Sequence, residues 1–241
     1  GKGMVIGHSA FVQTNKTMEF QIIGDDDQES GMSIQRYSND DSPPRIWFAK
    51  SNGALGTPGT AVTDDAVLGE IRFMGDDGGD LATNGALIQV LVDDSGSGSI
   101  AANQIPAAMT FYTAAGASAN DVGERMRIDP AGNVGIGATA PSGRLHVVVD
   151  DTYGEAYFEN ADSVASNDFG LKMQRAKGTI ASKAIVADGD RTGFIGWQGY
   201  DGSSYKYTSA INSYVDGTPG TNDMPGRLTF STTPDDSITL A

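Results

Sequence analysis

The sequence predicts an all-β fold made of tandem repeat units that are joined by glycine-rich connectors. Three observations support this fold class: short segments that alternate apolar and polar residues, 32 glycines dispersed among Asn, Asp and Ser, and a long internal repeat. Short strands separated by frequent turns have this composition. The glycines follow no strict period of three residues, so a collagen triple helix is excluded.

The internal repeat relates two long segments of the chain. Residues 68–78 (LGEIRFMGDDG) match residues 192–202 (TGFIGWQGYDG) at an offset of 124, and residues 106–113 (PAAMTFYT) match residues 225–232 (PGRLTFST) at an offset of 119. The change of offset falls in a stretch rich in Gly, Asp and Ser, where surface loops vary in length. Self-similarity of this kind predicts two copies of one structural unit.

Two shorter matches extend the alignment. Ala86 meets Ala210 at the offset of 124. Near the start of each copy, residues 31–36 (GMSIQR) match residues 170–175 (GLKMQR).

The matches divide the chain into three parts. Residues 4–10 (MVIGHSA) resemble residues 134–140 (VGIGATA), so residues 1–16 are interpreted as the end of a preceding connector. Residues 17–149 are predicted to form the first β repeat unit with its connector. Residues 150–241 are predicted to form the second β repeat unit, which stops where its own connector is expected to begin.

Individual strands are predicted where apolar and polar residues alternate. Residues 109–113 and 228–232 are rich in Thr and aromatic residues, which favour strands, and residues 125–129 and 144–149 follow the same pattern. No window offers a sustained helical stripe with caps. Each unit is expected to pack as a β-sandwich.

The stretch from residue 124 to residue 147 (ERMRIDPAGNVGIGATAPSGRLHV) is the connector of the first unit. Val134 and Ile136 alternate with glycine. This pattern suits a place where three backbones approach closely around an axis, because glycine permits the approach and the β-branched residues fill the axis. We therefore hypothesise a homotrimer.

Composition excludes several classes of function. The chain of 241 residues carries 16 basic and 31 acidic residues, for a formal net charge of −15. Such a surface repels nucleic-acid phosphates, so nucleic-acid binding is not expected. No cysteine is present, so there is no disulfide framework. No apolar run reaches the roughly 20 residues that span a bilayer, so membrane insertion is not expected.

Few residues are suited to catalysis. Histidine occurs only at His8 and His146, and neither accompanies a nucleophile motif or a second His at metal spacing. The adjacent Asp pairs sit beside Gly or Ser, which is typical of turns, whereas a Ca²⁺ site needs about six to eight oxygen ligands. No Lys-Ser/Thr pair follows the glycines of 132–137 to make a phosphate loop. The chain is expected to be no enzyme and to have no catalytic, cofactor-binding or metal site.

Aromatic residues cluster in the second unit. Tyr200 and Tyr205 flank the turn at Asp201, and aromatic rings beside Asp suit carbohydrate recognition. These three residues are the candidate glycan contacts. Trp197 matches Phe73 in the repeat and is expected to lie in the core.

The connector resembles a recurrent motif, ERMRID-x-x-GNVGIGT-x-x-P, of phage tail fibres, tailspikes and phage-like adhesive fibres of bacteria. Ala138 stands where the motif usually has Thr. The pattern that begins at Leu68 is similar to the repeat that usually precedes this motif, so that the resemblance covers nearly the whole chain. It implies homotrimers, β-structure and assembly in a virion or on a cell surface.

The resemblance implies a structural or adhesive segment of a trimeric viral tail fibre, which links or presents a receptor-binding surface. Two alternatives stay open: a glycan-degrading tailspike segment, which would need a carboxylate pair in a groove, and a bacterial surface adhesin fibre. The expected partners are two further copies of the chain, neighbouring fibre segments and a host-surface glycan. The expected location is a virion tail fibre or an extracellular surface fibre.

Overall fold

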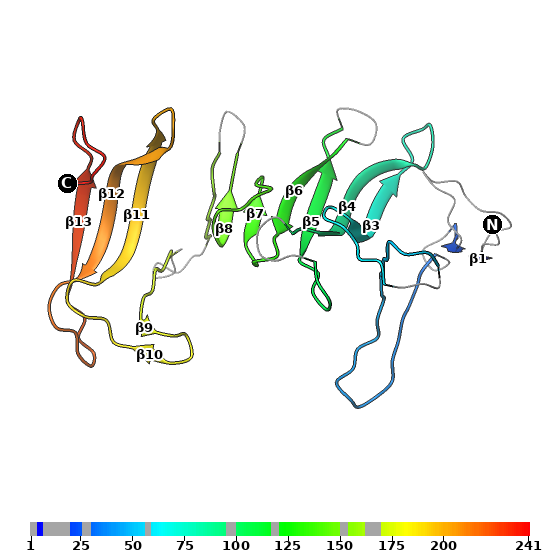
Figure 1. Ribbon diagram of the computed structural model, residues 1–241, viewed down its shortest axis with the longest axis horizontal. Coiled ribbons are helices and arrows are strands. Elements are labelled where there is room, and N and C mark those ends of the chain that lie inside the picture. Colours follow the sequence, from blue (N-terminus) through cyan, green and yellow to red (C-terminus); the bar gives the residue numbers. More distant parts are fainter. Residues whose placement is uncertain are drawn as a thin grey trace. The chain divides into compact units, whose positions relative to one another are not determined.

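The computed structural model of the protein describes residues 4–6, 20–25, 30–55, 59–94, 100–116, 121–149, 154–161 and 170–241. Within these residues it contains thirteen β-strands and no helix, so the predicted all-β class is confirmed (Figure 1). It follows that no described helix could cross a membrane.

The chain divides into two compact units, Gly1–Glu155 and Ala156–Ala241, and each is described by itself. The domain limits that the sequence predicts, at residues 16 and 149, stay a prediction, because a compact unit need not coincide with a repeat unit. His8 and most of residues 1–16 lie outside the described residues.

A six-stranded sheet dominates the first unit. Its strands are β3 (Val67–Gly75), β4 (Thr83–Val92), β5 (Ala107–Ala114), β6 (Val122–Ile128), β7 (Val134–Ile136) and β8 (Leu145–Val147), in that spatial order. Neighbours pair antiparallel, except that β7 and β8 are parallel. A separate parallel pair, β1 (Met4–Ile6) and β2 (Phe20–Ile22), belongs to the same unit. The strands predicted between residues 109 and 149 thus coincide with β5 to β8 to within a few residues.

The second unit contains a three-stranded antiparallel sheet of β11 (Arg191–Tyr200), β12 (Tyr205–Val215) and β13 (Gly226–Thr232). A short hairpin of β9 (Lys177–Gly178) and β10 (Lys183–Ala184) precedes it. The register of this sheet repeats that of β3, β4 and β5. Ile195, Ile211 and Phe230 lie opposite one another, as do Ile71, Ile88 and Phe111 in the first unit.

Register shifts interrupt the two sheets at matching positions. The β3–β4 pairing shifts between Val67 and Gly69 and between Phe73 and Met74, and the β11–β12 pairing shifts between Arg191 and Gly193 and between Trp197 and Gln198. A bulge of this kind adds one residue to one strand and turns the side chains beyond it.

The register corrects one detail of the sequence alignment. Ala86 lies opposite Phe73, whereas Ala210 lies opposite Gly196, one position away from the counterpart of Phe73. The structural counterpart of Ala210 is therefore Leu87, and both residues are buried. The alignment of Ala86 with Ala210 is wrong because, between matching strand positions, the β11–β12 turn is one residue shorter than the β3–β4 turn, which a fixed offset cannot follow.

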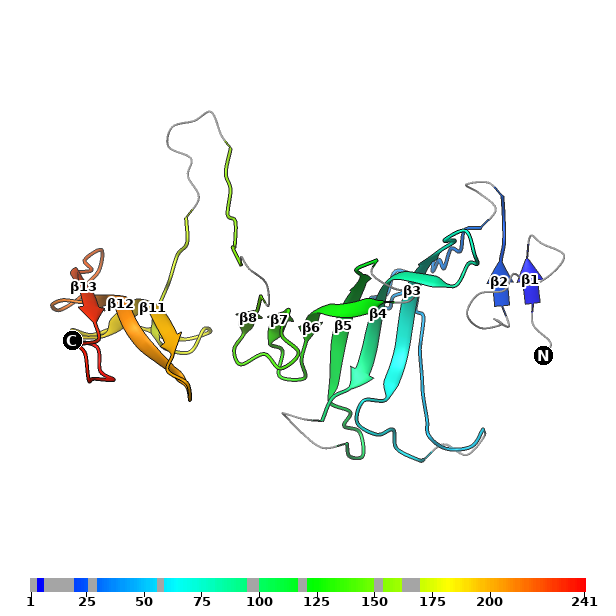
Figure 2. The same cartoon turned by 90° about the horizontal axis from the view of Figure 1, so that it is seen from above.

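The expected β-sandwich is also wrong. Within each unit, no second layer of described strands covers the main sheet, and the six-stranded sheet is a single twisted layer (Figure 2). Short Gly-rich strands therefore leave one sheet face without a second layer from the described residues of its own unit.

The connector makes a tight turn and then a parallel strand pair. The Asp129 carboxylate accepts hydrogen bonds from the backbone N–H (2.8 Å) and the side-chain amide (2.9 Å) of Asn133, which closes the β6–β7 turn. The chain then returns to place β8 beside β7, where the Val134 N–H donates to the Arg144 carbonyl over 2.9 Å and the Val148 N–H donates to the Ile136 carbonyl over 2.9 Å.

Glycine is required twice in this loop. A Cβ atom at Gly135 would overlap the carbonyl oxygen of Ala138, and one at Gly137, which has a φ of 67°, would overlap that of Val148. The close approach that these glycines permit lies within one chain, rather than between three chains as the sequence argument supposed.

We predict that Gly135→Ala and Gly137→Ala each lower the free energy of unfolding by about 1–3 kcal/mol, because the added methyl group must displace backbone. Denaturant unfolding at one fixed protein concentration measures the effect. Gly143→Ala is the matched control, since it lies in the same loop, a Cβ there meets nothing within 4 Å, and its φ is not positive. Equal stability of all three variants would contradict this account.

Candidate functional site

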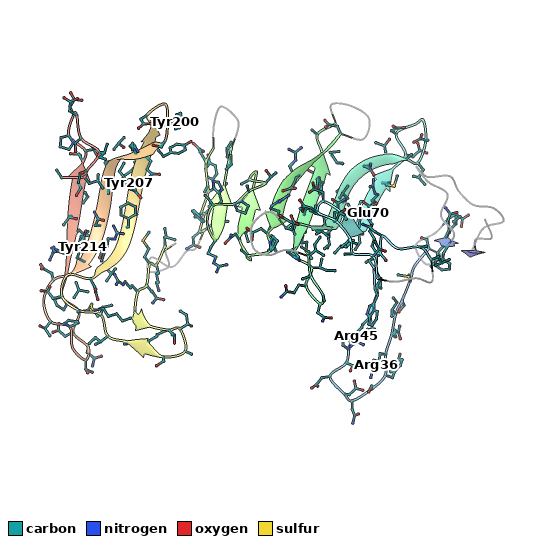
Figure 3. The ribbon with its side chains drawn as sticks, in the orientation of Figure 1. Arg36, Arg45, Glu70, Tyr200, Tyr207 and Tyr214 are labelled. Carbon is teal, nitrogen blue, oxygen red and sulfur yellow. The ribbon has the colours of Figure 1, made fainter. Side chains whose placement is uncertain are left out.

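The predicted glycan contacts come together at the β11–β12 turn. Tyr200 and Tyr205 lie opposite each other in the register, with ring centroids 5.5 Å apart and ring planes at 60°. The exposed fractions of the two side chains are 62% and 68%. Figure 3 marks Tyr200 at the tip of the hairpin. The two rings thus form an exposed aromatic pair at the end of the sheet, with Asp201 beside them in the turn.

Asp201 holds the turn itself. Its Oδ1 accepts hydrogen bonds from the N–H of Ser203 (2.8 Å), the hydroxyl of Ser203 (2.9 Å) and the N–H of Ser204 (2.8 Å). These hydrogen bonds, led by the one from the Ser204 backbone, lower the pKa of Asp201 to about 2. Among the described residues, nothing donates to its Oδ2, which leaves that atom available to a ligand.

The counterpart of Asp201 in the first unit has the same structural role. Asp77 accepts the N–H of Gly79 at 2.9 Å through Oδ1 and the hydroxyl of Thr83 at 2.6 Å through Oδ2. The Thr83 hydrogen bond is the largest cause of a lowered pKa for Asp77. Asp77 forms this turn although no tyrosines flank it. The primary role of the carboxylate in both units is therefore to stabilise the turn.

Other acidic residues also close turns. Asp64 accepts the N–H of Asp94 (3.0 Å), and its counterpart Asp188 accepts the N–H of Gly217 (2.8 Å). Burial raises the pKa of Asp94, and the nearby negative charge of Asp64 adds to the effect. In the part of the chain that the structure describes, no three His, Cys or acidic side chains converge as a metal would need.

One face of the first sheet carries a polar cluster, which we call the polar face: Glu70, Arg72, Gln89, Tyr112, Glu124 and Arg127. Arg127 donates to Glu124 over 2.7 and 2.9 Å and to Asp93 over 3.2 Å. The exposed fractions of these three side chains are only 9–13%. Glu124 is the largest cause of a raised pKa for Arg127. Arginine paired in this way with two carboxylates joins β6 firmly to the end of β4.

The sequence did not predict this cluster. Strict alternation would put Glu124 and Arg127 on opposite faces of β6. The pairing shifts between Phe111 and Tyr112, so that Arg125 is the extra residue of a bulge and Glu124 joins the face of Arg127. The only signal in the sequence is the alternation of charged and apolar residues in ERMRID (124–129), and this alternation does not reveal a bulge.

The opposite face of each sheet is apolar, and we call it the apolar face. In the first unit one cross-strand row consists of Ile71, Ile88, Phe111, Met126, Ile136 and Val147. In the second unit the corresponding row is Ile195, Ile211 and Phe230. Phe230 is 75% exposed and Ile71 is 49% exposed, so that these rows lie open in the single chain.

Trp197 is not buried in its own chain. Its exposed fraction is 50%, and that of its counterpart Phe73 is 56%. The expectation that Trp197 lies in a core is therefore wrong for a single chain, because this edge of the sheet is covered by no second layer. His146 is half-buried in β8 and accepts a hydrogen bond from the Ser142 N–H at Nδ1 over 3.4 Å, which gives it a turn contact rather than a catalytic partner.

Comparison with known proteins gives a structural likeness and no sequence relative. No protein family matches the chain, and no curated protein does. The fold is similar to the carboxy-terminal domain of the bacteriophage T5 L-shaped tail fibre, at 15% identity and a TM-score of 0.68 over 88% of this chain and 86% of that chain. It is also similar to the same domain with its intra-molecular chaperone domain, at 16% identity and a TM-score of 0.70. That match covers 88% of this chain and 58% of the other chain. The chain thus has the all-β fold of a phage tail fibre domain.

We predict that the carboxyl group of Asp201 titrates with a midpoint near pH 2, measured from its carbon chemical shift against pH. Because the folded pKa is depressed, the stabilisation by Asp201 is complete above about pH 4, the pKa of an unfolded Asp, and is lost as pH falls toward 2. Asp201→Asn keeps an acceptor oxygen and should lack this part of the acid sensitivity. A midpoint near 3.8 would refute the turn geometry.

Proposed function

We propose that the chain is a non-enzymatic structural and adhesive segment of a trimeric viral tail fibre. The observation that carries the proposal is the open apolar face of each sheet, together with the likeness of the fold to a tail fibre domain. The segment links neighbouring parts of the fibre and presents a receptor-binding surface, in a virion tail fibre or an extracellular surface fibre.

The amount of exposed surface supports assembly with other copies. The accessible surface is 18314 Å² for a chain of 25.1 kDa. A compact monomer of this mass exposes about 10,000 Å². Large apolar side chains exposed side by side on a sheet mark an interface, and the alternation of an apolar and a polar face gives each sheet one side to bury.

Three copies around an axis would satisfy both sheets at once. The apolar rows of the first and second units occupy corresponding register positions, so the same mode of burial between copies can serve each sheet. The matching registers and bulges also support two tandem units of one design.

The exposed tyrosines support adhesion to a glycan. Tyr207 lies against Phe194 with ring centroids 5.4 Å apart, and both rings cover the position where a side chain at Gly196 would stand. With Tyr200 and Tyr205 they line one side of the β11–β12 hairpin, where aromatic rings would meet the C–H faces of a host-surface sugar. A bacterial surface adhesin fibre would use the same two features.

The glycan-degrading alternative has less support. Glu70 and Glu124 are the carboxylates nearest to a cluster, yet Glu70 contacts Arg72 and Glu124 contacts Arg127 through both oxygens, with no described groove between them. A glycosidase needs one carboxyl group that stays protonated beside one that is ionised.

We predict a species of three chains of 25.1 kDa in sedimentation. Ile71→Asp or Phe230→Asp should abolish the three-chain species, because each places a charge on the apolar face. Leu55→Asp, at a fully exposed residue outside both sheets, is the control and should stay assembled. A folded single chain of the unaltered protein would refute the proposal.

We predict that Tyr200→Ala and Tyr205→Ala each weaken binding on a glycan array by roughly three- to tenfold, since an aromatic contact contributes about 0.5–1.5 kcal/mol. Tyr214→Ala is the control, because the Tyr214 ring lies under the Arg227 guanidinium at 5.1 Å and away from the hairpin turn. Release of reducing sugar from a bound glycan would favour the tailspike alternative instead.

A further inference from the structure

Each sheet is preceded by an extended arm that has little contact with its own unit. Arm 1 is residues 31–49 and arm 2 is residues 170–185. In Figure 1 arm 1 runs away from the strands of its sheet, and Figure 3 marks Arg36 and Arg45 near its far end. Every residue of both arms is exposed.

Arm 1 leaves apolar side chains and backbone polar groups open to water. Trp47 is 78% exposed, Phe48 59% and Ile46 58%. Among the described residues, the backbone of 31–37 and of 43–49 forms no hydrogen bond, and the backbone hydrogen bonds of the arm are confined to the N–H groups of Asp40 and Ser42. Extended backbone with unpaired N–H and C=O groups is a template for pairing with another chain.

Both arms are attached at the same place. Phe48 of arm 1 lies on Gly69, whose position for a Cβ atom is 2.6 Å from the Cβ of Phe48. Met173 of arm 2 lies on Gly193, the counterpart of Gly69, with its sulfur 3.3 Å from the corresponding position. Each arm therefore starts from the edge of an apolar face, at the first bulge of its sheet.

An open hollow lies beside each attachment. The hollow in the first unit has a volume of about 320 Å³ and is lined by Phe48, Leu68, Ile71, Ile88, Val90 and Met109. The hollow in the second unit has a volume of about 290 Å³ and is lined by Leu171, Met173, Phe194, Ile195, Ile211 and Leu228. Either hollow has room for one or two large apolar side chains, and within its own unit the arm supplies only one wall.

The charge of arm 2 indicates what it meets. Lys172, Arg175, Lys177 and Lys183 lie in arm 2, which has no acidic residue, while the whole chain carries −15. Within its own chain, Lys177 contacts Asp190 at 3.0 Å and Arg175 contacts it at 3.6 Å. Lys172 and Lys183 are left for other acidic groups, and a second copy of this chain offers many.

We propose that the arms are exchanged between copies: arm 1 and arm 2 of one chain each cross to the apolar face of a neighbouring chain and place a side chain in its hollow. The inference rests on the trimer proposed above and adds the way its chains are locked together. In arm 1, exchange buries the exposed side chains, pairs the open backbone and fills the hollow through one contact. In arm 2, whose tip is the β9–β10 hairpin, exchange buries the exposed side chains and fills the hollow.

The protein contains no cysteine, so disulfide cross-linking tests the exchange directly. Ile34→Cys with Ile88→Cys probes arm 1, and Ile180→Cys with Ile211→Cys probes arm 2, whose tip residue Ile180 is 91% exposed. After mild oxidation, either double variant should run as a ladder of two and three chains on a denaturing, non-reducing gel. The four single variants, oxidised separately, are the controls and should form no species of three chains.

Sedimentation of the same samples separates the two proposals. Sedimentation could show three chains while neither double variant forms cross-links between chains. That result would overturn the exchange and leave the trimer standing. A single chain would overturn both. As a second measurement, amide hydrogen exchange of residues 31–37 and 43–49 should be slowed at least tenfold relative to an unstructured peptide, and exchange at the peptide's rate would also overturn the proposal.

Discussion

The structure depends on one constraint: each sheet is a single layer with one apolar face, and the described residues of its own unit leave much of that face exposed. In the first unit the side chains of the polar face form ion pairs, such as that between Arg127 and Glu124, whose side chains are largely buried. The opposite row, from Ile71 to Val147, is open. A single layer gains little stability by itself, because burial of apolar surface is the main favourable contribution to folding. In the proposed trimer, assembly of the chains and folding of the sheets are therefore coupled.

The bulges decide which side chains lie on the apolar face, which would meet the other chains of the proposed trimer. The extra residue Arg125 lets Met126 and Ile128 stay on the apolar face while Glu124 and Arg127 share the polar face. The bulges beside Gly69 and Gly193 leave a position without a side chain, and an arm residue covers each of them. A slip of one residue in either sheet would exchange the two faces, so that the bulges and the turn carboxylates of Asp77 and Asp201 protect the interface as well as the strands.

The sequence predicted the strands better than their packing. Alternation located β5, β6 and β13 because apolar and polar residues alternate there without interruption, and the repeat predicted that Phe111 and Phe230 are counterparts. It failed where a turn of different length changes the offset, as at Ala86, and where a second layer was assumed, as for Trp197. The turn at Tyr200, Asp201 and Tyr205 was found from residue types alone. The hydrogen bonds that make Asp201 a turn residue depend on the backbone of Ser203 and Ser204, which side-chain identity does not reveal.

The two units differ most on the faces that would not be shared with a symmetry mate. At three matching positions, Glu70, Arg72 and Asn84 of the first unit are replaced by Phe194, Gly196 and Tyr207. In the first unit Arg72 joins Glu70 and Asn84 by hydrogen bonds. In the second unit Gly196 leaves room for the Phe194 and Tyr207 rings, and Arg191 lies over Phe194 at 4.8 Å. A face buried between three chains tolerates little change, whereas a face toward solvent can exchange an ion-pair network for aromatic rings without altering the assembly. That freedom is what a fibre needs in order to build a binding surface on one unit and a plain shaft on the next.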